Sequence, residues 1–237
     1  GGMVRLLFIL VLAVGSPGPA AERPDYALVI HGGAGRIVEA ELPKKTAGVY
    51  RSRLHAALER GRQILERGGS SAEAVIACIT VMEDDPLFNA GRGSVLNAEG
   101  VVEMDASIMA GDGRRAGAVA AVRRIKHPIL AAWRVMQDSP HVLLVADGAD
   151  RFAASRGLEV VDNQHFITPW QRKVLREVQE GGQGAGDGVA GSWSSLGTVG
   201  CVALDREGHL AAGTSTGGLA GKIPGRVGDR PLIGAGT

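Results

Sequence analysis

The sequence contains few cysteines and almost no net charge. Cys78 and Cys201 are the only cysteines in 237 residues, too few for a disulfide framework or a metal knuckle. Both lie in apolar runs, which predicts two buried free thiols. Because 26 Lys and Arg oppose 25 Asp and Glu, the formal net charge is +1. This balance excludes a generally basic nucleic-acid binder and an acidic tail.

Motifs for zinc and for dinucleotides are also missing. The Gly-rich run at 31–35 lacks the G-x-G-x-x-G spacing of a dinucleotide fingerprint and instead predicts a turn after a strand. No group of His, Cys and Asp residues has the spacing of zinc ligands. The scattered histidines are therefore interpreted as structural: His31, His141, His165 and His209.

Glycine, in contrast, is abundant. The chain has 36 glycines in 237 residues, about twice the usual share of roughly 7%. No Gly-X-Y period accompanies them, which excludes collagen and indicates many tight turns and close backbone approaches. Hydrophobic residues at 45% and charged residues at 22% suit a folded chain with a substantial core. The length fits one large domain or two small ones.

The first twenty residues resemble a leader rather than part of the fold. Arg5 precedes a short apolar run at 6–14, and the small residues Gly18 and Ala20 predict a cut before Ala21. This run is too short for a membrane span of about 20 residues. A signal peptide at 1–20 implies export to the periplasm or secretion, with no membrane segment in the mature form. The alternatives are a lipid-free N-terminal anchor and a buried first strand.

Strand and helix patterns alternate along the rest of the chain. A capping box at 70–73 opens one helix, and Asp105 lies inside an apolar strand, where it needs buried partners. The Gly/Ser-rich tract at 181–195 is typical of a flexible linker. Strands are expected at 26–31, 101–110, 115–123, 198–205 and 209–216, an apolar stretch at 142–145, and helices at 51–67, 74–82, 128–136, 149–155 and 170–180. Alternation alone permits a parallel α/β fold, but the hairpin signals favour antiparallel pairing.

The junction between Gly197 and Thr198 suits one particular chemistry. A threonine hydroxyl is a weak nucleophile without a base beside it. If the bond before Thr198 is broken, the new α-amine, with a pKa near 7.7–8.0, lies next to the hydroxyl and can act as that base. Gly197 has no Cβ to oppose the strained geometry of an N→O acyl shift. The alternative is a simple entry from a loop into a strand.

Five motifs occur in a characteristic order: HGGAG at 31–35, NAGRG at 89–93, GTVG at 197–200, TSTGG at 214–218 and GRVGD at 225–229. Together, from about residue 27 to 237, they resemble the plant-type (type 2) L-asparaginase and isoaspartyl peptidase family of N-terminal-nucleophile (Ntn) hydrolases. The glycosylasparaginase branch is similar around Thr198 but usually reads Thr-Ser-Thr-Asn-Gly, whereas this chain has Gly217 and Gly218. The resemblance therefore favours the isoaspartyl peptidase and asparaginase branch.

The resemblance implies catalytic roles for three residues. Thr198 would cleave the chain after Gly197 and then attack β-aspartyl amides. Thr216 matches the threonine that hydrogen-bonds at the nucleophile, and its hydroxyl can both donate and accept. Asn89 matches an asparagine whose amide could polarise the scissile carbonyl. An Asx turn before Gly91 is the alternative for Asn89.

The substrate clamp and the cation loop are also implied by the resemblance. Arg226 would bind the substrate α-carboxylate, Asp229 its α-ammonium, and Gly218 would bring the backbone close to it. A mutual salt bridge between Arg226 and Asp229 is the alternative. No cofactor is required, but a structural sodium ion is expected on backbone carbonyls. Its ligands would come from Met82, Glu83, Asp85, Phe88, Ala90 and Arg92.

The implied fold is α+β: the four-layer αββα sandwich of the Ntn hydrolases, with two stacked antiparallel sheets and a truncated C-terminus. The α chain would span 21–197 and the β chain 198–237, assembling as a homodimer of αβ units. The expected substrates are isoaspartyl dipeptides and L-asparagine, which the sequence does not rank. Three alternatives stay open: a glycosylasparaginase-like amidase, a catalytically dead fragment or remnant that binds aspartate-like ligands, and an exported structural protein.

Overall fold

A computed structural model describes residues 25–33, 44–181 and 197–237 of the chain. The predicted signal peptide at 1–20 and nearly all of the predicted linker at 181–195 lie outside these residues, so both stay predictions. Within the described ranges, no helix combines the length and the apolar character that a bilayer span requires.

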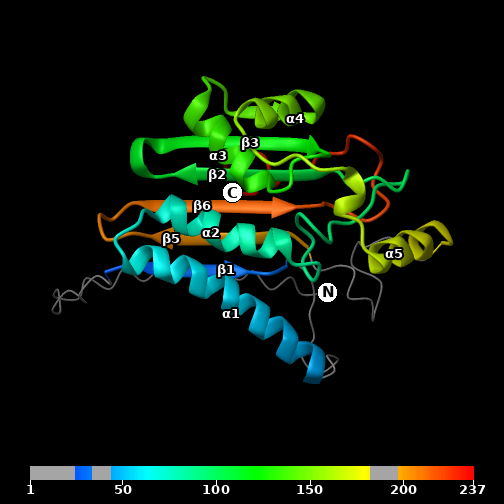
Figure 1. Cartoon of the computed structure of the whole chain (residues 1–237), viewed down its shortest axis with the longest axis horizontal. Coiled ribbons are helices and arrows are strands. Elements are labelled where there is room, and N and C mark those ends of the chain that lie inside the picture. The colour runs from blue at the N-terminus through cyan, green and yellow to red at the C-terminus, as the bar shows by residue number, and fades with distance from the viewer. Residues whose placement is uncertain (1–24, 34–43, 182–196) are drawn as a thin grey trace, which may run out of the picture.

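The strands form one sheet in the order β1-β5-β6-β2-β3-β4 (Figure 1). All neighbours are antiparallel except β3 and β4, which run parallel. The five predicted strands are therefore not divided between two sheets, because all of them join this sheet with β4 as a sixth. The bounds are β1 Ala27–His31, β2 Met104–Ala110, β3 Arg115–Val122, β4 Leu143–Val145, β5 Val199–Leu204 and β6 Leu210–Thr216.

The predicted helices are all present among the described residues. The capping box is confirmed: the Ser70 side chain accepts from the Glu73 backbone N–H, and the Glu73 carboxylate accepts from the Ser70 backbone. Pro128 occupies the first turn of α3, where a missing N–H costs little. The bounds are α1 Lys44–Glu66, α2 Ser71–Asp84, α3 Pro128–Asp138, α4 Ala146–Ser155 and α5 Pro169–Gln179.

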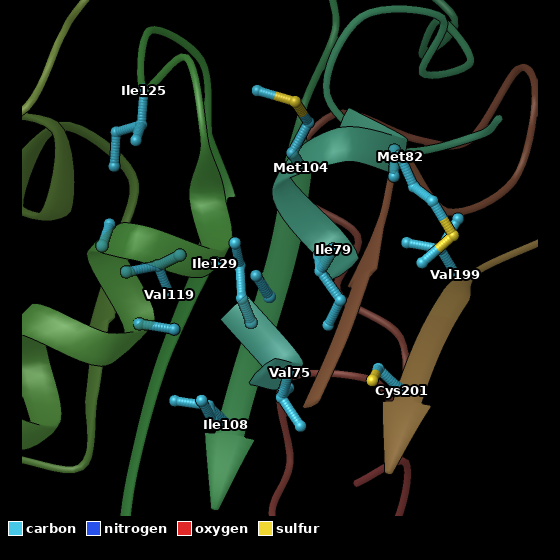
Figure 2. Close-up of a cluster of buried hydrophobic side chains, with 14 of the residues drawn as sticks. Val75, Ile79, Met82, Met104, Ile108, Val119, Ile125, Ile129, Val199 and Cys201 are labelled. Atoms are coloured by element: carbon cyan, nitrogen blue, oxygen red, sulfur yellow. The ribbon is translucent and has the colours of Figure 1, made fainter. Parts of the chain in front are cut away.

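The hydrophobic core lies between the sheet and helices α2 and α3 (Figure 2). Val75 and Ile79 of α2 meet Ile108 of β2 and Ile129 of α3, and all four side chains are fully buried. At Gly213 of β6, a Cβ would lie 2.7 Å from Val75 and 3.1 Å from Ile79. Glycine thus lets α2 pack tightly on the middle of the sheet, and Gly213 marks the face of β6 that the helices cover.

Side chains alternate along a strand, so the residues between these core positions point to the opposite face. Val199 and Cys201 face the helices, which places Thr198 on the other face. Ser215 donates to Glu83 of α2, which places Thr216 there as well. Figure 1 shows the C-terminus beside β2 and β6. The segment after β6 therefore covers part of the helix-free face.

A bulge in β3 explains the buried Asp105. Met104 pairs with Val122 whereas Ala106 pairs with Val119, so β3 carries one extra residue here. Ala121 in this bulge has a φ of 52°, and its N–H donates to Asp105 Oδ1 at 2.9 Å. Burial raises the pKa of Asp105. The structural interpretation of Asp105 is supported. Cys78 and Cys201 are likewise buried and free.

Candidate active site

Thr198 lies at the entrance to β5, at the edge of the helix-free face. Its side chain is almost fully buried, with 3% of the residue exposed. Oγ1 accepts a hydrogen bond of 2.8 Å from Nε of Arg230. The predicted nucleophile is therefore held in a defined position, and a cation touches the oxygen that would react.

Thr216 lies across the ladder from Thr198. The register pairs Val199 with Ser215 in antiparallel strands, so the next residues outward, Thr198 and Thr216, face each other. Oγ1 of Thr216 accepts from the backbone N–H of Gly218 at 2.9 Å. Among the described residues this hydroxyl donates no hydrogen bond, so its proton is free for a group near Thr198, and the orienting role stays a prediction.

Asn89, in the loop after α2, holds the turn that follows β6. Its Nδ2 donates to the Gly218 carbonyl at 2.9 Å, and its backbone oxygen accepts from Gly217 N at 3.1 Å. Oδ1 accepts from Val95 N at 3.0 Å. The donor lies six residues after Asn89, whereas an Asx turn bonds the N–H two residues on. The side chain of Asn89 therefore does not form an Asx turn before Gly91. The amide fixes the geometry of Gly218, and among the described residues the second N–H of Nδ2 has no acceptor.

Gly218 supplies a close backbone approach. Its φ of 76° lies in the left-handed region, which glycine adopts without the penalty of a side chain. A Cβ would lie 3.1 Å from Lys222 Nζ and 3.4 Å from Arg226 Nη1. The predicted clamp residue Arg226 therefore has its guanidinium beside the turn that carries Gly218.

Arg226 and Asp229 do not pair with each other. The Asp229 carboxylate forms an ion pair with Nη1 of Arg230, and no hydrogen bond or ion pair of the Arg226 guanidinium is found within the described ranges. The alternative of a mutual salt bridge is wrong. A guanidinium without a protein carboxylate is suited to an anionic ligand.

The segment at 222–226, which leads to Arg226, is held in place by the buried Lys222. Lys222 is 6% exposed, and its Nζ donates to the Glu103 carbonyl at 2.8 Å. Gly225 N donates to the Glu103 carboxylate at 3.0 Å. Burial lowers the pKa of Lys222, while the charges of Asp105 and Glu103 act in the opposite direction. The segment before Arg226 is thus tied to the start of β2.

The sequence profile of the Asparaginase family matches residues 24–237. The isoaspartyl peptidase of Salmonella typhimurium is 44% identical over 212 residues, 88% of this chain and 68% of the relative. The bovine isoaspartyl peptidase/L-asparaginase is 47% identical over 211 residues, with coverage of 88% and 66%. Arabidopsis thaliana has a probable isoaspartyl peptidase/L-asparaginase 2 that is 42% identical over 233 residues, with coverage of 90% and 71%.

The chain belongs to the asparaginase family. It is thereby an amidohydrolase of the Ntn group, which confirms the resemblance drawn from the five motifs. The chain spans about two thirds of the length of these relatives. Its structure brings Thr198, Thr216, Gly218 and Asn89 together at one end of β5 and β6.

The loop at 82–92, where the sequence analysis expects a sodium ion, folds back on itself through backbone hydrogen bonds. Arg92 N donates to the Glu83 carbonyl at 2.7 Å, and Phe88 N donates to the Asp85 carbonyl at 3.1 Å, which close the loop. Gly91 has a φ of 51° at its tip. Within the described part of the chain, the carbonyls of Phe88, Ala90 and Arg92 accept no hydrogen bond. The other predicted ligands, the carbonyls of Met82, Glu83 and Asp85, each accept a backbone hydrogen bond. The sodium ion stays a prediction.

Two residues near Thr198 were missed by the sequence analysis. Arg230 follows the GRVGD motif directly, yet nothing in the sequence indicates that its side chain reaches a residue 32 positions earlier. His31 was interpreted as structural, and its ring packs against Gly200, where a Cβ would collide with Nε2. Burial lowers the pKa of His31, and the charge of Arg230 lowers it further. Both side chains therefore belong to the surroundings of the nucleophile.

Proposed function

We propose that this chain is an autoproteolytically activated hydrolase that cleaves β-aspartyl peptides and the side-chain amide of L-asparagine. One observation carries the proposal: Thr198 faces Thr216 across the end of the β5–β6 ladder. The guanidinium of Arg226, for which the described residues provide no hydrogen bond or ion pair, lies beside Gly218 in the turn that follows. The names of the relatives, isoaspartyl peptidase and L-asparaginase, support the same activity.

Activation would begin at the peptide bond between Gly197 and Thr198. Oγ of Thr198 attacks the Gly197 carbonyl carbon, and the C–N bond breaks as the acyl group moves from nitrogen to oxygen. Water then hydrolyses this ester, which leaves a carboxylate on Gly197 and a free α-amine on Thr198. The α chain would span 21–197 and the β chain would begin at 198.

Turnover would use the amine created by this cleavage. The α-amine, with a pKa near 7.7–8.0, accepts the hydroxyl proton of Thr198. Oγ attacks the β-carbonyl of the substrate, and the amine returns the proton to the departing nitrogen as ammonia or an amino acid leaves. Water hydrolyses the acyl-enzyme to aspartate. Thr216 would hold the amine, and the free N–H of the Asn89 amide would stabilise the developing oxyanion.

Charge complementarity would orient the substrate. Arg226 would bind the α-carboxylate in a bidentate manner, and Asp229 the α-ammonium. Gly218 would allow the substrate to lie against the backbone. Removing either charged partner should mainly raise KM, since both groups contact parts of the substrate that do not react.

We extend this proposal to the ion, the assembly and the location. A sodium ion would lie on the carbonyls of the 82–92 loop, where it would stabilise the segment that carries Asn89. On the helix-free face, Val29 is 67% exposed and Val202 48% exposed, and this apolar surface supports a second sheet in a four-layer αββα arrangement. Dimerisation of αβ units and export by the 1–20 segment complete the proposal.

Intact-mass spectrometry of the full-length protein tests the activation step. The wild type should give two polypeptides whose masses sum to the precursor plus one water, with a new N-terminus at Thr198. The variant Thr198→Ala should stay in one piece and hydrolyse neither a β-aspartyl dipeptide nor asparagine. An unbroken wild-type chain with full activity would overturn the proposal.

A second threonine provides the matched control. Thr80 lies in α2, and its hydroxyl has no hydrogen-bond partner among the described residues. Thr80→Ala makes the same chemical change without touching the site, and it should cleave and turn over like the wild type.

A further inference from the structure

The side chain of Arg230 connects the predicted nucleophile to solvent. Nε donates to Thr198 Oγ1 at 2.8 Å, and Nη1 pairs with the Asp229 carboxylate. Nη2 has no hydrogen-bond partner within the ranges that the structure describes. The Arg230 side chain is 29% exposed whereas Thr198 is buried. One edge of the guanidinium thus lies at the reacting oxygen, and another is open to an arriving group.

The backbone of Arg230 is fixed to the same sheet that carries Thr198. Ser107 Oγ of β2 lies 2.6 Å from the Arg230 carbonyl, and Thr214 Oγ1 of β6 lies 3.1 Å from it. Both side chains are buried. A carbonyl held by two buried hydroxyls gives the guanidinium a defined starting point, and this reduces the entropy lost when the side chain binds a ligand.

The two expected substrates differ in what they place beside Oγ. In both, the β-carbonyl carbon must approach Thr198 Oγ1, so the leaving nitrogen comes within one bond of the reaction centre. Asparagine releases ammonia, which carries no further group. An isoaspartyl peptide releases an amino acid whose α-carboxylate is separated from the leaving nitrogen by a single carbon. A cation in contact with Oγ1 is therefore within reach of this second carboxylate.

A carboxylate is a better hydrogen-bond partner for the Arg230 guanidinium than the neutral hydroxyl of Thr198. A guanidinium forms stronger hydrogen bonds to a carboxylate than to a neutral oxygen, and it can bind both carboxylate oxygens at once. An arriving carboxylate would thus draw Nε away from Thr198 and free the lone pair of Oγ1 for attack. Asparagine has no group that would do this.

We infer that Arg230 is a specificity-determining residue that binds the α-carboxylate of the leaving amino acid and makes isoaspartyl peptides better substrates than asparagine. This inference rests on the proposed function and adds a preference to it. It assigns Arg226 and Arg230 to two different carboxylates of the same peptide substrate.

The test combines a change in the enzyme with a change in the substrate. The full-length, processed protein is assayed with β-aspartyl-leucine and with its C-terminal carboxamide, in wild type and in Arg230→Met. The wild type should prefer the free acid by at least tenfold in kcat/KM, and Arg230→Met should reduce this preference to less than threefold. Rates are normalised to the cleaved fraction measured by mass spectrometry, because Arg230 contacts Thr198.

Two further variants keep the test decisive. Arg230→Lys retains a cation and should retain part of the acid preference even if Arg230→Met is not processed. Arg226→Met is the matched control: it should slow the free acid and the carboxamide equally, since both contain the same aspartyl carboxylate. A wild type that hydrolyses acid and carboxamide equally well would overturn the role of Arg230. A wild type that cleaves neither of them nor asparagine would instead overturn the proposed function.

Discussion

Asn89 Nδ2 donates to the carbonyl oxygen of Gly218 at 2.9 Å across 129 positions of sequence. This bond joins the loop after α2 to the turn after β6, and so joins the candidate cation loop to the candidate substrate site. Both partners were singled out by the sequence, but their contact exists only in the folded chain.

Replacing Asn89 by alanine should damage both the turn and the site. Asn89→Ala leaves the buried N–H of Val95 without its acceptor, which should cost about 1–3 kcal/mol in the free energy of unfolding. Activity of the folded, processed enzyme should fall by at least tenfold, because Gly218 loses its support. Urea unfolding and kcat/KM with a β-aspartyl dipeptide measure the two effects.

Asn163 provides the control for this variant. Its amide bonds the backbone of Val102 and Arg123 outside the site. Asn163→Ala should therefore cost a similar amount of stability while the folded enzyme keeps its activity. Equal losses of activity in both variants would contradict a specific role for Asn89.

The loop at 82–92 should respond to sodium. Replacing NaCl by choline chloride at equal ionic strength should lower the Tm of the wild type, because an ion that binds only the native state stabilises it. A change of about 1 kcal/mol corresponds to roughly 2–4 °C for a domain of this size. In Gly91→Ala this difference should vanish, since a Cβ would lie 2.7 Å from Cβ of Glu83 and distort the loop.

Gly68 separates this effect from backbone strain. Its φ of 80° is also positive, but a Cβ there would meet nothing within 4 Å. Gly68→Ala should lower the Tm in both salts and keep the sodium difference. Loss of the difference in Gly68→Ala, or its survival in Gly91→Ala, would argue against the cation loop.

His31 should make the free energy of unfolding depend on pH below the ordinary histidine pKa of about 6.5. Its pKa is lowered by burial and by the charge of Arg230. As the pH falls through 6.5, the unfolded chain binds a proton that the native state resists, so the free energy of unfolding falls. His31→Gln should remove this part of the acid-side loss between pH 7 and pH 5, as urea unfolding can show.

NMR titration measures the effect of Arg230 on the pKa of His31 directly. The imidazole signal of His31 should titrate below 6.5 in the wild type and at a higher pH in Arg230→Met, because the neighbouring cation is gone. An unchanged midpoint would mean that Arg230 does not act on His31.

Asp105 should stabilise the bulge in β3. Asp105→Ala removes the acceptor for Ala121 N–H, and the unsatisfied buried donor should cost about 1–3 kcal/mol. Asp105→Asn keeps an oxygen at the same place and should cost less. Urea unfolding distinguishes the two. Asp112→Ala is the reference: Asp112 is exposed, and surface substitutions usually change the free energy of unfolding by no more than about 0.5 kcal/mol. Equal losses of stability in Asp105→Ala and Asp112→Ala would contradict the role of Asp105.

Much of the architecture follows from local patterns in the sequence. The apolar strands, the capping box at 70–73, the proline at the start of α3 and the glycine turn before β6 all depend on neighbours a few residues apart. The motifs singled out Thr198, Thr216, Asn89, Gly218 and Arg226. These residues lie near one end of β5 and β6, and their roles stay predictions. The ion pair between Asp229 and Arg230 was not predicted, because the sequence does not show which of two nearby arginines a carboxylate contacts.

The sequence alone determined the family, the candidate nucleophile and most elements, because periodicity and short motifs are local properties. Only the tertiary structure decided that the predicted strands share one sheet, that Arg230 reaches Thr198, and that His31 packs on Gly200. Each of these depends on strand order and on which face a side chain occupies. Strand order is set by burial of apolar surface across the whole chain, and no local spacing encodes it.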